Sequence, residues 1–529
     1  MISKEILSHT RKYWILFLGI MALGIFSRVW EFNNLPSGLN KDETSIGVEA
    51  YDIYHFGMDR NGVSDPIFFI SWGSGQNALY GYLLIPFIAV FGLSSFTVRL
   101  PMLITGILCL PLIFEVGKLS FDKETGFLAM FLLAISPWHI MLSRWGLESN
   151  LLPFVFLLGY FCLIKSLKSL KKSIWFILAC FFFALCFYAY GTAYAFIPLF
   201  FGLALILFVF KKTFKPGTLI SGVALFVLLS LPIGLFIYVN SFRLTSIHLS
   251  FITIPRLPSQ PRYEAVSSIF NLRNFFHSLY GDTKILGKLL LFQTDGESRD
   301  VLVPYGYLYT ITFPFALIGA GSLLFSLFKK SQQFYQSILL LLWLGISVVV
   351  GVLQQSNFNR VNIIFIPIIF CLANFLLWIK KRFNPGFILV IIAFVIAFFS
   401  FNIAYHGEPA RAQIDAKYFV GMIPATDYIS HVDTSSPVCV SDQISMAYIF
   451  VLFSERMNPK SYLSIIDYVD PAADFRIVRH LDRYSFGIDN CVSSPKTIYL
   501  FQANEKSPTG AGQFKKMSFG DYIVYIHQP

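Results

Sequence analysis

The feature that most limits the fold of this chain is a series of long apolar segments. A helix that spans a bilayer needs about 20 apolar residues, and the sequence contains about eleven such segments. Only 13% of the 529 residues are charged, whereas soluble domains average about 25%. We therefore expect an all-α polytopic membrane protein. The expected spans are 12–30, 98–117, 125–142, 151–165, 173–189, 190–210, 217–239, 305–328, 334–353, 361–379 and 385–404.

Basic residues between these segments predict the orientation. Clusters at Lys165–Lys172, Lys211–Lys215 and Lys380–Arg382 fall on one side, whereas the short connections on the other side contain little beyond Arg144 and Arg360. Lysine and arginine favour the cytoplasmic side. The expected location is the cytoplasmic (inner) membrane, with a cytoplasmic N-terminus and an extracytoplasmic C-terminal part. The net charge of +11 is then a topology signal, and nucleic acid is not expected as a partner.

One apolar segment, residues 79–92, is too short for a span. It has fourteen residues and contains Pro86, which suits an interfacial or re-entrant helix. Counting it as a span would place every lysine cluster outside, so we place it at the outer surface. Four segments then face outward: the loop 31–97, the turn 143–150, the loop 240–304 and the tail 405–529.

The chain is expected to have two domains, a transmembrane domain over residues 1–404 and a small soluble α/β domain over residues 405–529. Strand-like and helix-like stretches alternate in the tail. Cys439 and Cys491 lie there, and the sequence is equally compatible with a disulfide and with two buried thiols.

Two adjacent carboxylates stand at the start of an expected helix within LPSGLNKDETSIGVEAYDIYHFG (35–57). Asn40 can cap this helix, with Glu43 reaching back as in a capping box. The helix dipole at the same position keeps Asp42 ionised and able to accept a proton. A structural and a catalytic interpretation of Asp42 and Glu43 are therefore both open.

The second outward segment, SPWHIMLSRWGLESN (136–150), contains Arg144 and Glu148. These two residues are four apart and can form a simple ion pair, or Arg144 can anchor the segment among lipid headgroups. An arginine beside acidic residues at this depth also suits a phosphate-bearing lipid. Arg360, in QQSNFNR (354–360), is either part of an ordinary polar turn or a second phosphate contact.

Taken in order, LPSGLNKDE, LYGYLLIPFIAVFGLSSFTVRLP and AISPWHIMLSRWGLESN resemble the C-type (GT-C) glycosyltransferases of the protein O-mannosyltransferase and lipid A aminoarabinose transferase superfamily. The resemblance covers roughly residues 10–400 and is sharpest over 35–150, whereas the tail matches only by position. It implies a GT-C fold and a membrane glycosyltransferase that uses a polyprenyl-phosphate-linked sugar. The acceptor would be a glycan, a lipid or a protein outside the cytoplasm.

The resemblance also implies roles for residues. Asp42 would act as the general base in an inverting displacement, with Glu43 binding or orienting the acceptor and Glu148 at the second acidic position. Arg144 and Arg360 are candidates to bind the lipid phosphate. No cofactor is required by this mechanism, and a divalent cation is left open.

The long outward loop departs from the family. Arg299, a further candidate for substrate binding, is followed by Asp300 in GESRDVLVPYGYLY (296–309), where many relatives carry an Arg-His pair. Two other functions remain open, a lipid-sugar transporter or flippase and a non-catalytic envelope assembly protein. Transporters place charges and broken helices near the bilayer midplane, whereas the candidate charges here lie at the outer boundary. The donor sugar and the acceptor are not encoded in any recognisable motif.

Overall fold

The computed structural model describes residues 2–265, 275–328, 333–432, 434–492, 494–508 and 514–527. The chain divides into two compact units. The helical unit contains Met1–Phe32, Met102–Leu231 and Tyr263–Ala410, and the mixed unit contains Asn33–Pro101, Pro232–Arg262 and Arg411–Pro529. The mixed unit thus includes most of the 31–97 segment and the start of the 240–304 loop as well as the C-terminal tail.

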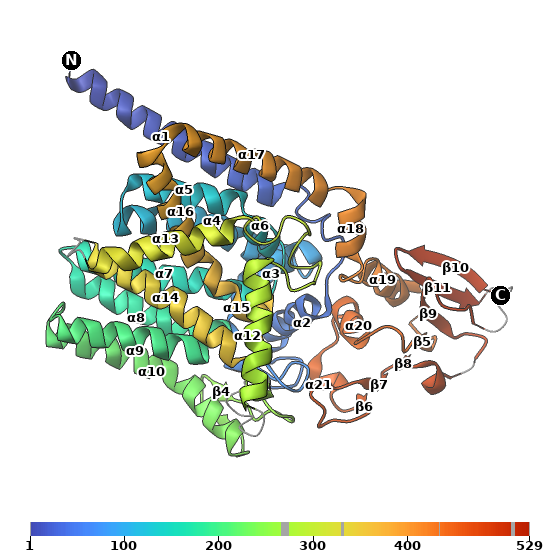
Figure 1. Cartoon of the computed structure of the whole chain (residues 1–529). Coiled ribbons are helices and arrows are strands. Elements are labelled where there is room, and N and C mark those ends of the chain that lie inside the picture. Colours follow the sequence, from blue (N-terminus) through green and yellow to red (C-terminus); the bar gives the residue numbers. More distant parts are fainter. Residues whose placement is uncertain are drawn as a thin grey trace. The chain divides into compact units, whose positions relative to one another are not determined.

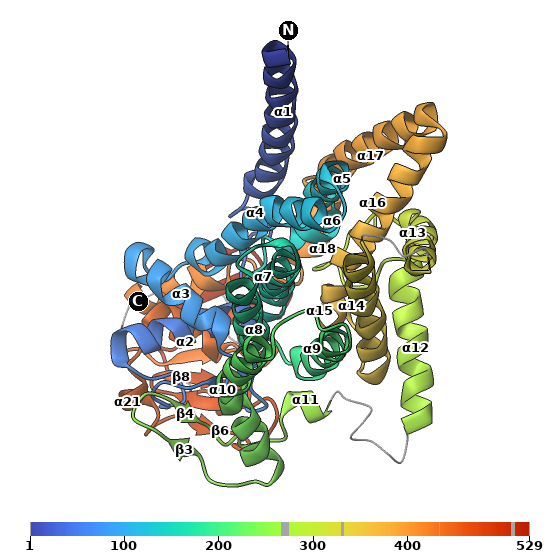
Figure 2. The same ribbon diagram turned by 90° about the vertical axis from the view of Figure 1, so that its left-hand side faces the viewer.

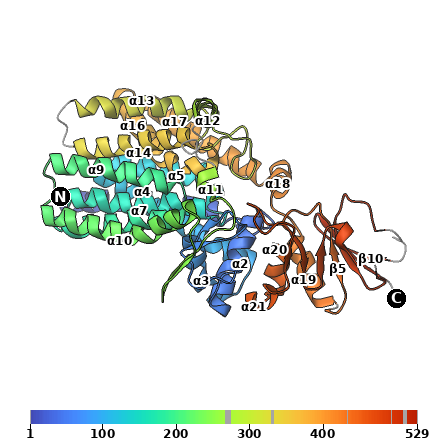
Figure 3. The same cartoon turned by 90° about the horizontal axis from the view of Figure 1, so that it is seen from below.

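The helical unit consists of long apolar helices, several of which run alongside one another; α8 with α9 and α9 with α14 are examples (Figures 1 and 3). Its helices are α1 Ile2–Val29, α5 Lys123–Ile135, α6 Pro137–Leu142, α7 Glu148–Lys168, α8 Lys172–Ala189, α9 Ala193–Phe210, α12 Phe275–Leu291, α13 Thr312–Leu327, α14 Phe334–Leu353, α15 Phe358–Val361, η3 Asn362–Ile364, α16 Phe365–Arg382 and α17 Asn384–Tyr405. Four helices have residues in both units: α4 Ser95–Ser120, α10 Pro216–Ser241, α11 Arg262–Ala265 and α18 Glu408–Asp415.

Aromatic side chains fill the core of the helical unit. The Phe156 ring lies 4.6 Å from the Trp343 ring and 5.1 Å from the Phe200 ring, measured between centroids. All three side chains are fully buried. Much of the phenylalanine content of the chain is therefore explained by helix packing, because each ring buries a large apolar area.

Nine helical segments within the described ranges are long and apolar enough to cross a bilayer, against the eleven expected. The expected span 125–142 is divided into α5 and α6. Ser136 caps α6, accepting a hydrogen bond from the His139 backbone N–H at 3.4 Å, and Pro137 occupies its first turn. The expected span 305–328 is represented by α13, which has only 16 residues.

Two short helices, α2 (Lys41–Phe56) and α3 (Leu79–Phe91), pack side by side in the mixed unit (Figure 2). The 13 residues of α3 extend about 20 Å, well short of the roughly 30 Å hydrocarbon core. This length agrees with the prediction that 79–92 is not a span. Two small hairpins accompany these helices: β1 Phe68–Phe69 pairs with β2 Gln76–Asn77, and β3 Ile247–His248 pairs with β4 Thr253–Ile254.

The C-terminal part of the mixed unit is built on a seven-stranded sheet with strand order β10-β11-β9-β5-β8-β7-β6. Strand β5 is parallel to both of its neighbours, β8 and β9, and the other pairs are antiparallel. The strands are β5 Val438–Val440, β6 Asp467–Tyr468, β7 Val478–Leu481, β8 Tyr484–Phe486, β9 Ile498–Gln502, β10 Phe514–Phe519 and β11 Tyr522–His527. The remaining helices are α19 Met422–Val432, α20 Tyr448–Glu455, α21 Pro459–Tyr462 and η4 Ile488–Asn490. The expected α/β character of the tail is confirmed.

Candidate functional site

The first turn of α2 is fixed by a capping box. The Asn40 side chain accepts a hydrogen bond from the Glu43 backbone N–H at 2.9 Å, and the Glu43 carboxylate accepts one from the Asn40 backbone N–H at 3.2 Å. Without these two bonds, the backbone N–H groups of Asn40 and Glu43 would lack partners at the start of the helix. The structural role that the sequence offered for Glu43 is therefore present.

Glu43 also forms a buried ion pair. Arg99 reaches it from the first turns of α4, with Nε 2.8 Å from one carboxylate oxygen and Nη2 3.0 Å from the other. The same guanidinium donates hydrogen bonds to the carbonyl oxygens of Pro36, at 2.7 Å, and of Gly38. Glu43 and Arg99 are both completely buried. The Glu43–Arg99 pair thus holds the 36–38 segment and the start of α2 in place.

Asp42 has different surroundings from its neighbour. It is half-buried, and its Oδ1 accepts a hydrogen bond from the Trp72 indole Nε1 at 3.0 Å. Among the described residues this is the one hydrogen bond that the Asp42 carboxylate makes, so Oδ2 is available. A carboxylate in a first helical turn is stabilised in its charged form by the helix dipole. The geometry leaves Asp42 oriented by Trp72, with its second oxygen available to accept a proton.

Trp72 is held from two sides within the mixed unit. The Arg60 guanidinium lies 4.5 Å from the centre of the Trp72 ring, and the Tyr448 ring meets the indole edge to face at 6.1 Å. The backbone is fixed too, because the Trp72 carbonyl accepts a hydrogen bond from the Arg476 N–H at 2.9 Å. A Cβ on Gly73, whose φ is +132°, would lie 2.4 Å from the Ala473 carbonyl oxygen. The donor to Asp42 is therefore fixed by residues far away in the sequence.

A group of buried carboxyls lies behind Trp72. Arg60 pairs with Glu49, with Nε 3.0 Å from Oε1, and its backbone N–H donates to Oε2 at 2.9 Å. Burial, together with the charge of Glu49, raises the pKa of Asp52 to about 9 and that of Asp59 to about 8. Burial therefore favours the protonated forms of Asp52 and Asp59.

The remaining predicted residues lie in the helical unit. Arg144 is buried in the turn before α7 and donates hydrogen bonds to the carbonyl oxygens of Ser27, at 2.9 Å, and Trp30. Glu148 is the first residue of α7 and is also buried. Arg144 lies in the turn that precedes this helix, whereas Glu148 begins it. Asp42 belongs to the mixed unit, so its expected proximity to Glu148 stays a prediction.

Three loops of the helical unit that carry predicted residues meet one another. Ser149, next to Glu148, accepts a hydrogen bond from Asn362 through its backbone carbonyl at 2.9 Å, two residues from Arg360. The backbone N–H of Phe358 donates to Asp295 at 3.1 Å, which joins the loop of Arg299 to the turn of Arg360.

Arg299 and Asp300 are neighbours in the loop 296–309 and differ in exposure. The Arg299 guanidinium lies 5.7 Å from the Trp145 ring centre, and its side chain is about one-third exposed. Burial raises the pKa of Asp300 well above its usual range. Burial thus favours the protonated form of Asp300, which follows Arg299 in the sequence where the expected pattern has histidine.

Sequence reasoning missed Arg28. Its guanidinium is fully buried and donates to the carbonyl oxygens of Gly24, Leu133 and Ala134 at 2.8, 3.0 and 3.1 Å, and it lies 2.8 Å from His139 Nδ1. The signal was available, because a charged residue inside an apolar segment marks a functional or structural polar site. Arg99 was present in the quoted VRLP motif but was assigned no role, and Trp72 gave no sequence signal. Within the described residues, no group of three or more His, Cys, Asp or Glu side chains is arranged to hold a metal ion.

Comparison with known proteins adds a family match and a fold match. Residues 77–236 match the family described as dolichyl-phosphate-mannose-protein mannosyltransferase. No curated protein sequence matches the chain. ArnT from Cupriavidus metallidurans in the apo state has a similar structure, with a TM-score of 0.53, 11% identity and 98% of each chain covered. The same protein bound to undecaprenyl phosphate gives a TM-score of 0.52 with 10% identity over 98% of each chain.

The oligosaccharyltransferase of Archaeoglobus fulgidus in the apo form is also similar, with a TM-score of 0.51 and 13% identity over 84% of this chain. The match spans 64% of the length of that longer protein. At these identities the structural likeness establishes a shared fold. The fold of this chain is therefore that of ArnT, the GT-C fold expected from the sequence.

Proposed function

We propose that the chain is a GT-C glycosyltransferase that transfers a sugar from a polyprenyl-phosphate-linked donor to an extracytoplasmic acceptor. The family match over residues 77–236 and the fold shared with ArnT support this proposal. The observation that carries the proposal is the Asp42 carboxylate, half-buried, in the first turn of α2 and held by Trp72. ArnT from Cupriavidus metallidurans has the same fold and binds undecaprenyl phosphate. This relative supports a lipid-phosphate donor for the present chain.

The proposed reaction is a single inverting displacement. Asp42 Oδ2 takes the proton of an acceptor hydroxyl while the hydroxyl oxygen attacks the anomeric carbon of the donor. The bond between that carbon and the phosphate oxygen breaks, and the polyprenyl phosphate leaves with the electron pair. A base positioned in this way contributes about 10²–10⁴-fold to the rate.

The other residues have supporting parts in this proposal. Glu43, held by Arg99, positions the turn that presents Asp42. Glu148 is proposed to contact the acceptor from the helical unit. Arg144, Arg299 and Arg360 are proposed to neutralise the leaving phosphate, a role that suits the forked guanidinium group. A divalent cation could bind the same phosphate. Measuring transfer with and without a chelator tests whether the reaction requires one.

We place the protein in the cytoplasmic membrane with the N-terminus inside and the tail outside. A Ser169→Cys variant should resist a membrane-impermeant thiol reagent in intact cells, because Ser169 follows Lys165 and Lys168 at the end of α7. A Ser507→Cys variant should be labelled. The free cysteines of the described chain are all buried, so a cysteine-intact parent gives the background. Labelling of Ser169→Cys from outside would contradict the orientation.

The experiment that tests the proposed function compares cells with and without the protein. Masses of envelope glycans, glycolipids and glycoproteins are measured in both, together with the polyprenyl-phosphate sugars. We expect one class of product to lose the mass of one sugar when the protein is absent, while a lipid-linked sugar accumulates. Identical product masses and unchanged lipid-linked sugars would contradict glycosyl transfer.

A further inference from the structure

The mixed unit contains a cavity that the proposed chemistry does not use. It has a volume of about 750 Å³ and lies at the carboxyl ends of β5 and β8. Its walls come from the loop 441–447 after β5 and from the segment 486–490 at the end of β8. Because β5 has a parallel neighbour on each side, the carboxyl ends of β5, β8 and β9 lie at the same edge of the sheet. Ligand sites in sheets of parallel strands form at such an edge.

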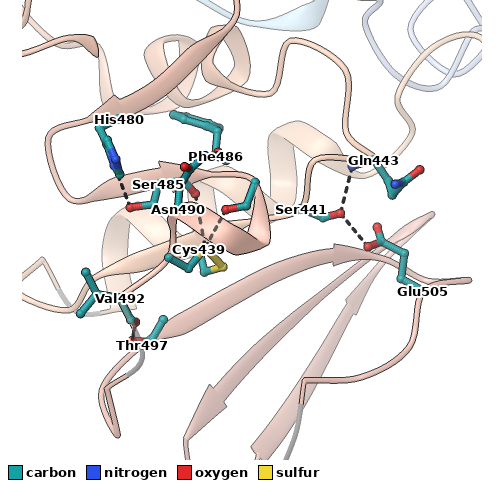
Figure 4. The surroundings of a disulfide bond; sticks show 12 residues. Cys439, Ser441, Gln443, His480, Ser485, Phe486, Asn490, Val492, Thr497 and Glu505 are labelled. Atoms are coloured by element: carbon teal, nitrogen blue, oxygen red, sulfur yellow. Dashed lines mark hydrogen bonds between the residues drawn. A yellow bond between two sulfur atoms is a disulfide. The ribbon is translucent and has the colours of Figure 1, made fainter. Parts of the chain in front are cut away.

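The walls of this cavity are held by covalent and hydrogen bonds (Figure 4). Cys439 on β5 forms a disulfide with Cys491, directly after η4, with the two Cα atoms 5.4 Å apart. This pairing resolves the two possibilities left open by the sequence. Asn490 Nδ2 donates to the Phe486 carbonyl at 2.6 Å, and Ser441 Oγ donates to Glu505 at 2.6 Å. The cavity is therefore a formed feature of the folded domain.

The lining combines hydrogen-bonding groups with exposed apolar side chains. Asp442 and Asp489 are exposed carboxylates, and Gln443 adds an exposed amide. Ile477 and Ile488 line the cavity with 58% and 51% of their surface exposed, so their carbon atoms are available to a ligand. A pocket of apolar walls with a few polar groups is typical of a small-molecule site.

The charge of the lining narrows the ligand class. The lining residues include two aspartates and no lysine, arginine or histidine, although the chain as a whole carries a net charge of +11. Carboxylates repel phosphate and other anions at short range. They accept hydrogen bonds from hydroxyl groups, and amides both donate and accept them. The chemistry fits a polyhydroxylated ligand that is neutral or carries an amino group.

One wall of the cavity connects to the proposed base. Tyr448 lines the cavity, and its ring meets Trp72 at 6.1 Å. Trp72 in turn donates the hydrogen bond to Asp42. All of these residues belong to the mixed unit. Two side chains in contact therefore link the cavity to the carboxylate that would activate an acceptor hydroxyl.

From these observations we infer that the cavity at the carboxyl ends of β5 and β8 binds a saccharide portion of the acceptor. Saccharide binding is inferred from the cavity itself. The identification of the saccharide as part of the acceptor rests on the proposed function. Asp442, Asp489 and Gln443 bind sugar hydroxyls, and the isoleucine side chains cover the apolar face of the ring. The acceptor would then carry at least one sugar beyond the hydroxyl that reacts.

The test is saturation-transfer NMR on the full-length protein in lipid nanodiscs. The probes are the methyl glycosides of glucose, mannose, galactose and N-acetylglucosamine, together with glucosamine, inorganic phosphate and pentalysine. The wild-type protein should transfer saturation to at least one of the sugars. The double variant Asp442→Lys/Asp489→Lys should bind that sugar about tenfold more weakly or worse, because it loses hydrogen bonds to charged groups.

Two further variants make the result decisive. Ser445→Trp fills the cavity without changing its charge and should also abolish binding. Asp427→Lys changes an exposed acid on α19 away from the lining and should bind like the wild type. The inference is overturned if no sugar binds, if both cavity variants bind as well as the wild type, or if only pentalysine or phosphate binds.

The same assay separates this inference from the proposed function. Asp42→Asn should bind the sugar normally while failing in transfer. Transfer by a wild-type protein that binds no sugar of the panel would overturn the cavity assignment alone. Sugar binding by a protein that supports no transfer in cells would overturn the proposed function alone.

Discussion

The two ends of α2 place carboxylates in opposite surroundings. At its first turn, Asp42 is half-buried and, among the residues that the structure describes, accepts a hydrogen bond from Trp72 alone. In its middle and just beyond its end, Glu49, Asp52 and Asp59 are buried, and burial raises the pKa of Asp52 to about 9. One helix therefore supplies a partly exposed carboxylate at its first turn and buried carboxyl groups further along.

The difference shows what makes a carboxylate available for chemistry. Water and the helix dipole favour the charged form at the first turn, whereas desolvation favours the protonated form in the interior. Arg60 connects the two ends, because it pairs with Glu49 and stacks on Trp72. The buried residues thus hold Trp72, which orients Asp42. Variants at each end of α2 can test the role of the buried and the exposed carboxyl groups separately.

The largest expected effect comes from removing the cation at the first turn. Arg99→Met should lower the free energy of unfolding by about 3–5 kcal/mol, because it leaves the buried Glu43 charge without its partner. Thermal unfolding of the purified protein in detergent measures the loss. Arg479→Met provides the control, since its pair with Asp467 is about 40% exposed on both sides, and such pairs contribute about 0–1 kcal/mol. Equal losses for the two variants would contradict the positioning role of Glu43 and Arg99.

A smaller effect is expected from Trp72→Phe, which keeps an aromatic ring but removes the N–H that binds Asp42. Transfer should fall about tenfold, because a hydrogen bond to a charged group contributes roughly 1.5–3 kcal/mol. The rate of product formation, followed by mass spectrometry, gives the ratio. Trp378→Phe, on an exposed tryptophan of α16, should leave the rate unchanged. If Trp72→Phe also retains the full rate, Trp72 does not orient the base.

The smallest effect is expected at the buried end. Folded Asp52 keeps its proton up to about pH 9, whereas unfolded Asp52 loses it near pH 4. The unfolded state thus binds fewer protons between these values, so the free energy of unfolding falls as pH rises. Asp52→Asn removes this dependence, and its melting temperature should fall less than that of the wild type between pH 7 and pH 8. The expected difference is about 3–5 °C, since one proton contributes about 1.4 kcal/mol per pH unit and 1 kcal/mol moves the melting temperature of a domain of this size by about 2–4 °C.

The control for this measurement is Asp427→Asn, which changes an exposed acid on α19. It should melt with the same pH dependence as the wild type. A steeper fall for Asp52→Asn than for the wild type would show that Asp52 is charged in the folded protein. The contrast between the two ends of α2 would then be wrong.

Local features of the site were predictable from the sequence. The capping box at Asn40 and Glu43 follows from residue types three positions apart, and the structure contains it. The lengths of the apolar segments predicted most of the long helices. The break between α5 and α6 was also encoded, because a serine followed by proline is a helix-start signal, but the apolar length of 125–142 outweighed it.

Long-range partners were not predictable. Trp72 and Asp42 are 30 residues apart, and Arg99 and Glu43 are 56 apart. The sequence around Trp72 or Arg99 does not indicate which residue it will contact, because a tryptophan or an arginine near an apolar segment has many possible contacts. The cavity has walls from several segments between residues 441 and 490, and the fold of the sheet alone brings them together.

The most direct test of the central claim is the restoration of envelope product masses in cells that lack the protein. The cells receive the wild type, Asp42→Asn, or Asp521→Asn, which changes an exposed acid in the turn between β10 and β11. The wild type and Asp521→Asn should restore the mass of the transferred sugar. Asp42→Asn, present in the membrane at the same level, should form product about 10²–10⁴-fold more slowly and leave the lipid-linked sugar accumulated. Full restoration by Asp42→Asn would contradict the assignment of Asp42 as the general base.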